Sequence, residues 1–324
     1  MTKFRLRHFI FAFLTVAVVA MISLLIGPLL PIREPAMGNS LSQRIEGQSV
    51  ESYLKEVEKP FLADLHPGFQ KQVHWAGEAE KKTPLGLVYF HGFSASPLDT
   101  SPMMARLAQE FGANLFLQRL SGHGFRNPLH LGDARWPDWL VDGEEAYQIG
   151  KKMAEQVVLV GTSTGALLAI KSALDHQSEN HIKAVVLLSP NFMPQAAGAM
   201  FLEGPLGPLW ARLFIGPERR YGVLTPAHEI YWSTHYPSRA VAELMNLVGL
   251  SQQWALTELH VPMLCIYTPE DKVVRVDRIE ENCHTMKAKL QVVGNRHEMI
   301  SEALGLTSTL PNLLGLTSEF IRSH

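Results

Sequence analysis

The feature that most constrains the fold of this chain is the pentapeptide Gly161-Thr-Ser-Thr-Gly165. A compact apolar run at 157–160 precedes it, and a run with helical spacing begins at Ala166. Two glycines in this pattern let the backbone turn sharply from a strand into a helix, which places the central serine hydroxyl at the edge of the sheet. The motif therefore predicts that Ser163 lies at the carboxyl end of a buried strand.

Apolar runs on both sides of this motif alternate between strand-like and helix-like patterns. We expect strands at 85–90, 114–117, 157–160, 184–188, 263–267 and 290–293, and helical spacing is present at 97–111, 136–153 and 166–174. Strands that alternate with helices are joined by right-handed crossovers and form a mostly parallel, doubly wound sheet. The predicted fold class is therefore α/β, with helices on both faces of the sheet.

The alternation stops at about 191–255, where prolines and aromatic residues are interspersed. This stretch cannot be one more simple crossover, so we expect an inserted, largely helical cap within a folded body at 49–324. Ligand pockets are mainly apolar with a few placed polar groups, and such a cap can roof one. Most of its aromatic residues would pack the cap onto the sheet.

The N-terminus has a different composition from the rest of the chain. Lys3, Arg5 and Arg7 precede an apolar run at 9–30, which is close to the ~20 residues that cross a bilayer. A cleavable signal has a shorter apolar core of ~7–15 residues. We therefore predict an uncleaved transmembrane helix at 1–30 and a linker or short amphipathic segment at 31–48. The alternative is secretion after signal cleavage.

The charges around this apolar run predict an orientation in the membrane. Positive residues before the run favour a cytoplasmic N-terminus, so the body would lie on the non-cytoplasmic side, periplasmic or extracellular in a bacterium. Cys265 and Cys283 are the only cysteines, and they can form one disulfide if the body lies in an oxidising compartment.

Charge and motif content exclude several classes of partner. The formal net charge is −2, and no run rich in Lys and Arg follows the first few residues, so we expect no nucleic-acid binding. No His-x-x-x-His or Cys-x-x-Cys spacing indicates a metal site, and no glycine-rich loop indicates a nucleotide. We therefore expect no cofactor and no metal.

Ser163 needs a base and a carboxylate to act as a nucleophile. The base takes the hydroxyl proton, and the carboxylate holds the base in the right tautomer. In strand–serine–helix folds of this kind the acid and then the histidine follow later strands. The strand at 263–267 is followed by Asp271, and the strand at 290–293 is followed by His297. Competing candidates, all less well placed, are Glu270, Asp277 and His284.

The loop after the first expected strand is the second candidate segment. Backbone N–H groups stabilise the oxyanion that forms when a serine attacks a carbonyl carbon. We expect these N–H groups to come from Thr164, at the start of a helix, and from Phe93. Gly92 would let the backbone approach the substrate, and Ser94 would add a side-chain contact or cap a helix. His91 would brace the loop rather than act as a base.

Five segments together resemble a known family: His91-Gly-Phe93, Leu120-Ser-Gly-His-Gly124, Trp136-Pro-Asp-Trp139, 161–165 and Pro269-Glu-Asp-Lys-Val-Val274. They are similar to the carboxylesterase, monoacylglycerol lipase and lysophospholipase branch of the α/β hydrolases, from about residue 85 to the C-terminus without the cap. The resemblance implies a Ser163, Asp271 and His297 triad with Phe93 and Thr164 as oxyanion donors. Its substrate pocket would be shaped by His91, Gly92, Ser94 and His123, the last in a structural role.

By that resemblance the chain would hydrolyse carboxylic esters through an acyl-serine intermediate. The apolar cap and the expected membrane helix favour a lipidic or medium-chain ester as the small-molecule substrate. The same fold also carries peptidase, lactonase and acyltransferase chemistry, and non-catalytic binding proteins. These remain the alternatives. At two positions the chain departs from the family pattern, with Thr162 where histidine is frequent and Ala166 where glycine is frequent.

Overall fold

The computed structural model describes residues 21, 32–35, 40–294, 296–297 and 308–324. Apart from residue 21, the predicted transmembrane helix at 1–30 lies outside the described residues. Within the ranges just given, no helix combines the length and the apolar character needed to cross a bilayer.

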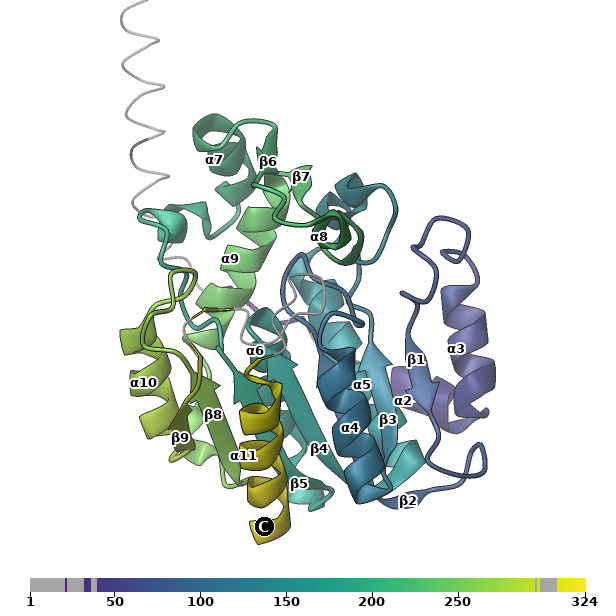
Figure 1. The fold of residues 1–324 in the computed structure, drawn as a ribbon. Helices are drawn as coiled ribbons and strands as arrows, with labels where there is room; N and C mark the ends of the chain where they lie inside the picture. Colours follow the sequence, from purple (N-terminus) through teal and green to yellow (C-terminus); the bar gives the residue numbers. More distant parts are fainter. Residues whose placement is uncertain (1–20, 22–31, 36–39, 295, 298–307) are drawn as a thin grey trace, which may run out of the picture.

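A seven-stranded sheet forms the centre of the molecule, with the strand order β1-β3-β2-β4-β5-β8-β9 (Figure 1). The strands are β1 Gln72–His74, β2 Thr83–Phe90, β3 Asn114–Gln118, β4 Ala154–Thr162, β5 Ile182–Leu188, β8 Met263–Tyr267 and β9 Lys289–Val292. Only β1 pairs antiparallel with its neighbour within this sheet, and the other pairs are parallel. The prediction of a mostly parallel α/β sheet is confirmed.

Helices cover both faces of this sheet because its strands bury side chains on both sides. In β4, Val157 and Leu159 belong to one core cluster, whereas Val158 and Val160 belong to another. The first face is covered by α5 Trp136–Met153, α6 Thr164–His176 and α10 Val276–Thr285, and the second by α4 Ser101–Phe111 and α11 Leu310–Ser323. A parallel sheet buried in this way reads as short continuous apolar runs, which is why the sequence showed it.

The folded body begins earlier than the predicted boundary at residue 49. Residues Ser40–Glu46 form helix α2, and α3 Val50–Glu58 follows it. Ile45 of α2 is buried in the same cluster as α5, and the Lys152 ammonium of α5 donates a hydrogen bond of 3.0 Å to the Ile45 carbonyl. The second half of the expected linker at 31–48 is therefore packed. A seven-residue helix with one buried side chain is too short to show helical periodicity.

The region between β5 and β8 is an insertion over the carboxyl ends of the strands (Figure 1). It contains η4 Ala199–Leu202, α7 Gly207–Phe214, β6 Glu218–Arg220, α8 Pro226–Tyr231, β7 His235–Pro237 and α9 Arg239–Ser251. The strands β6 and β7 pair antiparallel as a small separate sheet. Met245, Leu247 and Val248 of α9 are buried in the cluster that also contains α5 and α6. The insertion thus shares the main core through α9.

A disulfide joins Cys265 of β8 to Cys283 of α10, and both residues are fully buried. The bridge closes a short loop with a sequence separation of 18, and a loop of this size stabilises a fold by about 3 kcal/mol in the chain-entropy model. We expect dithiothreitol to lower the free energy of unfolding by that amount in urea denaturation curves. The Cys265→Ala/Cys283→Ala double variant should show no response to the reductant. Superimposable wild-type curves with and without dithiothreitol would contradict this prediction.

Candidate active site

Ser163 occupies a strained turn between β4 and α6, with φ 53° and ψ −114°. Both flanking glycines are needed for steric reasons. A Cβ at Gly161 would lie 2.5 Å from the Cα of Ala166, and a Cβ at Gly165 would lie 2.2 Å from the Phe90 carbonyl oxygen. The turn is therefore pressed against its own helix and against the end of β2. A non-glycine residue in such a conformation costs about 1–3 kcal/mol, which the surrounding packing must offset.

The structure brings Ser163, His297 and Asp271 into one hydrogen-bonded chain. The His297 Nε2 lies 3.0 Å from the Ser163 Oγ, and the His297 Nδ1 lies 2.7 Å from the Asp271 Oδ2. A carboxylate at Nδ1 favours the tautomer with its proton there, so Nδ1–H donates to Asp271 and Nε2 accepts from the Ser163 hydroxyl. The three groups come from the ends of β4, β8 and β9, where open α/β sheets place their sites.

Asp271 is held as a carboxylate by its surroundings. Its second oxygen accepts backbone N–H bonds from Val273 at 2.8 Å and Val274 at 2.9 Å. Burial acts to raise the pKa of Asp271, but the hydrogen bond and charge interaction with His297, reinforced by these two N–H groups, set that pKa below its usual value. When Asp271 is ionised, both of its carboxylate oxygens therefore accept hydrogen bonds.

The competing candidates from the sequence lie elsewhere. Glu270 and Asp277 are exposed, and Asp277 accepts a hydrogen bond of 3.0 Å from Arg275. His284 is exposed on α10. None of the three contributes to the cavity described below.

The two predicted oxyanion donors both line the cavity beside Ser163. Thr164 is the first residue of α6, where a backbone N–H has no partner within the helix. Phe93 follows Gly92, whose position is so close to the nucleophile that an added Cβ would lie 3.4 Å from the Ser163 Cβ. The loop after β2 therefore lies close to the nucleophile, as the predicted oxyanion role of the Phe93 N–H requires.

The four residues predicted to contact substrate divide into two pairs. Gly92 and Ser94 line the cavity, and the Ser94 hydroxyl lies 3.1 Å from the hydroxyl of Tyr221 in the cap. His91 and His123 are fully buried and do not line it. Their Nε2 atoms accept backbone N–H bonds, His91 from Leu120 at 3.1 Å and His123 from Ser94 at 3.0 Å.

These two histidines therefore brace the loops. Neither reaches the cavity, so their predicted place among the substrate-binding residues is wrong. Burial lowers the pKa of His91 well below its ordinary value and lowers the pKa of His123 to about 4. Both imidazoles are thus neutral near pH 7, which leaves each Nε2 free to accept a bond.

A cavity of about 710 Å³ opens above Ser163 and His297, between the sheet and the cap. Its cap side is mainly apolar and aromatic, with contributions from Tyr221, Trp232, Tyr236, Val241, Leu244 and Met245. Thr162 also lines it, and its hydroxyl accepts a hydrogen bond of 3.2 Å from Tyr89. That bond gives the threonine before the nucleophile a local partner. The sequence indicated an aromatic cap but could not show which of its side chains face the cavity.

The first residues of the insertion join the loops that carry Ser163 and Asp271. The Ser163 N–H donates to the Leu188 carbonyl at 2.8 Å, and the Asn191 N–H donates to the Ser163 carbonyl at 3.1 Å. Further along, the Gln195 N–H donates to the Val273 carbonyl and the Arg275 N–H donates to the Met193 carbonyl, both at 2.8 Å. We call residues 191–195 the strap. No signal in the sequence predicted it.

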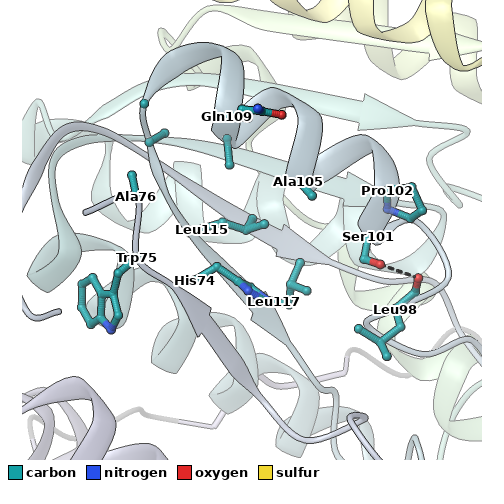
Figure 2. A pocket seen from close by; sticks show the side chains of 13 residues that line it. His74, Trp75, Ala76, Leu98, Ser101, Pro102, Ala105, Gln109, Leu115 and Leu117 are labelled. Atoms are coloured by element: carbon teal, nitrogen blue, oxygen red, sulfur yellow. Dashed lines mark hydrogen bonds between the residues drawn. The ribbon is translucent and has the colours of Figure 1, made fainter. Parts of the chain in front are cut away.

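A second hollow lies between α4 and the edge of the sheet formed by β3 and the chain at β1 (Figure 2). It has a volume of about 460 Å³ and is lined by residues such as His74, Trp75, Leu115 and Ala105. It shares no lining residue with the cavity above Ser163. The part of the chain that the structure describes contains no cluster of three or more His, Cys, Asp or Glu side chains suited to a metal ion.

Comparison with known proteins decides the family. Residues 87–293 match the model of the alpha/beta hydrolase family, which is more than half of the chain. The chain belongs to this family. The predicted resemblance to the α/β hydrolases is thereby confirmed, and the matched range includes the serine turn and Asp271. No curated protein matches this α/β hydrolase.

Solved structures share the fold of this α/β hydrolase at low sequence identity. A structure of the metagenome-derived lipolytic enzymes LipS and LipT matches with a TM-score of 0.61 at 20% identity, covering 80% of this chain and 100% of that chain. The monoacylglycerol lipase of Paleococcus ferrophilus matches at 0.53 and 14%, covering 77% and 98%. Est1E from Butyrivibrio proteoclasticus with bound ferulic acid matches at 0.51 and 17%, covering 78% and 95%.

Proposed function

We propose that this hydrolase cleaves carboxylic esters through an acyl-serine intermediate on Ser163. The observation that carries the proposal is the continuous chain from the Asp271 carboxylate through His297 to the Ser163 hydroxyl, with separations of 2.7 and 3.0 Å. In this arrangement a positioned base and its orienting acid activate a hydroxyl for attack.

The proposed reaction has two halves. The Ser163 Oγ attacks the ester carbonyl carbon while the His297 Nε2 takes the hydroxyl proton, and the Asp271 carboxylate stabilises the imidazolium that forms. The carbonyl oxygen becomes an oxyanion that accepts hydrogen bonds from the N–H groups of Phe93 and Thr164. His297 then gives its proton to the leaving alkoxide, and the alcohol departs. A water molecule, activated by the same histidine, hydrolyses the acyl-serine and restores the hydroxyl.

The cavity supports an apolar acyl group as the substrate class. The cap side chains Val241, Leu244 and Met245 face the space above Ser163, and burial of acyl methylene groups there would contribute about 0.8 kcal/mol each. Lipolytic enzymes and a monoacylglycerol lipase are among the proteins that share the fold. We therefore favour medium-chain or lipidic esters.

We also propose that residues 1–30 anchor the protein in a membrane and that the body lies on its non-cytoplasmic side. The apolar run at 9–30 with its preceding positive charges supports this orientation. The disulfide between Cys265 and Cys283 also supports it, because disulfides persist in oxidising compartments.

Two measurements on the full-length protein in detergent test the proposed ester hydrolysis. A fluorophosphonate probe should label one residue, and peptide mass spectrometry should find it at Ser163. p-Nitrophenyl esters with increasing acyl length should then be turned over, with kcat/KM rising from acetate toward medium chains, whereas a matched p-nitroanilide should not react. Labelling of another residue, or cleavage of the anilide in preference to the ester, would overturn the proposal.

A further inference from the structure

The outer surface of the cap carries an unusual concentration of exposed apolar side chains. Of fourteen exposed large hydrophobic residues among those described, eight lie between residues 200 and 230, so they are concentrated in one segment of the cap. They are Met200, Leu206, Leu209, Leu213, Phe214, Val223, Leu224 and Ile230. We call these eight residues the cap apolar face. An exposed apolar segment of this kind on a folded body indicates an interaction surface.

Helix α7 shows that this exposure is built into the cap. Its inner side buries Trp210 and Ala211, as expected of a helix that packs on a core. Its outer side should then be polar, but Leu209 and Leu213 are 57% and 66% exposed. Phe214, at the end of the helix, is 60% exposed although its ring stacks on that of Trp210. Seven of the eight residues of the cap apolar face do not line the cavity, Leu224 being the exception. The proposed catalytic chemistry therefore does not explain them.

The N-terminal part of the chain indicates what covers this surface. The apolar run predicted to cross a bilayer ends at Leu30, and Ile32 already packs against the main core. Two residues span at most about 7 Å. Glu34 next holds the segment on α6 through an ion pair with Lys171 at 2.7 Å. With the membrane segment proposed above ending at Leu30, a body that already packs at Ile32 would lie close to the bilayer surface.

We propose that the cap apolar face docks onto the surface of a lipid bilayer, the membrane that the N-terminal segment is predicted to cross. Its composition fits the boundary between headgroups and acyl chains, where apolar side chains insert and a cation remains beside the phosphates. Arg212 is the charged residue of α7, and its long stem lets the guanidinium extend toward lipid phosphates. A lipid ester could then pass from the membrane into the cavity beneath the cap, a step that rests on the proposed esterase function.

Quenching of a fluorophore by lipids tests the docking without any reference to catalysis. Both native cysteines are in the disulfide, so Leu213→Cys introduces a single free thiol for an NBD label. The full-length protein is reconstituted into phosphatidylcholine and phosphatidylglycerol vesicles, with and without lipids that carry a doxyl quencher near the headgroup. We expect the NBD fluorescence at position 213 to fall about twofold with the quencher.

Glu319→Cys is the matched label control, because α11 ends on the side of the molecule opposite the cap (Figure 1). Its fluorescence should not respond to the quencher. Equal responses at positions 213 and 319, or none at position 213, would overturn the proposal. A blue shift at position 213 that depends on protein concentration and not on the doxyl lipid would assign the surface to a second copy of the chain, and would also overturn it.

The consequence for substrate access has its own test. The triple variant Leu209→Gln/Leu213→Gln/Phe214→Gln should lose about tenfold in turnover of a monoacylglycerol embedded in the same vesicles. Its turnover of a water-soluble short-chain ester should be unchanged, since none of the three side chains lines the cavity. Val292→Gln, which removes an apolar side chain of 54% exposure outside the cap, is the control. Equal loss on both substrates would count against docking, whereas absence of wild-type activity on both substrates would count against the proposed function.

Discussion

Replacement of Ser163 by alanine should lower kcat for p-nitrophenyl ester hydrolysis by about 10⁶-fold, the loss expected when a serine nucleophile is removed. The residual rate would come from substrate binding and from the N–H groups of Phe93 and Thr164, which the substitution leaves in place. Alanine is smaller and still accommodates the backbone of the turn, so the circular dichroism spectrum should be unchanged. Stopped-flow and long-incubation assays together cover the required range of rates.

Ser172→Ala provides the control for the Ser163 variant. Ser172 is a buried serine on the same helix α6, with its hydroxyl 3.4 Å from the Gly143 carbonyl oxygen, and it does not line the cavity. Its replacement should leave ester turnover close to wild type. Retention of full turnover by Ser163→Ala would show that the nucleophile has been misassigned.

Replacement of Asp271 by asparagine should lower kcat by about 10⁴-fold. An amide in place of the carboxylate can present its NH₂ group to His297, which favours the tautomer with the proton on Nε2, and this tautomer cannot accept the proton of the Ser163 hydroxyl. The two backbone bonds from Val273 and Val274 can still be accepted by the amide oxygen, so we expect the loop to fold. The same p-nitrophenyl ester assay measures the effect.

Glu270→Gln is the matched control for Asp271→Asn, because it makes the same chemical change one residue earlier in the same loop. Glu270 is exposed, so its variant should keep wild-type turnover. If Glu270→Gln were the damaging substitution and Asp271→Asn the harmless one, the orienting acid would be the other carboxylate.

Much of the sheet could be predicted because its strands are buried on both faces. Apolar runs such as 263–267 are short, continuous and bounded by turn residues, and the structure has β8 at those residues. The elements that escaped prediction lack such a signal. β1 has three residues and α2 has seven, and neither is long enough to show a period.

The residues around the candidate site were predictable where one local motif fixes them. The two glycines around Ser163 have almost no alternative, since a Cβ at either would overlap backbone atoms. Whether a loop side chain points into the core or toward the cavity is instead decided by the segments packed against it, which a local motif does not specify. His91 and His123 were placed among the residues that shape the pocket, and the structure buries both between loops that are distant in sequence, in the bracing and structural roles expected of them.

The strap at 191–195 has a mechanical consequence for any opening of the cap. Asn191 is bonded to the carbonyl of Ser163, and Met193 and Gln195 are bonded to the segment that follows Asp271. A rigid-body swing that began at the end of β5 would pull on the nucleophile and the acid together and would disable the enzyme while it opened. Any hinge for cap opening would therefore lie beyond Gln195. The cap could then move to admit substrate while Ser163 and Asp271 keep their positions.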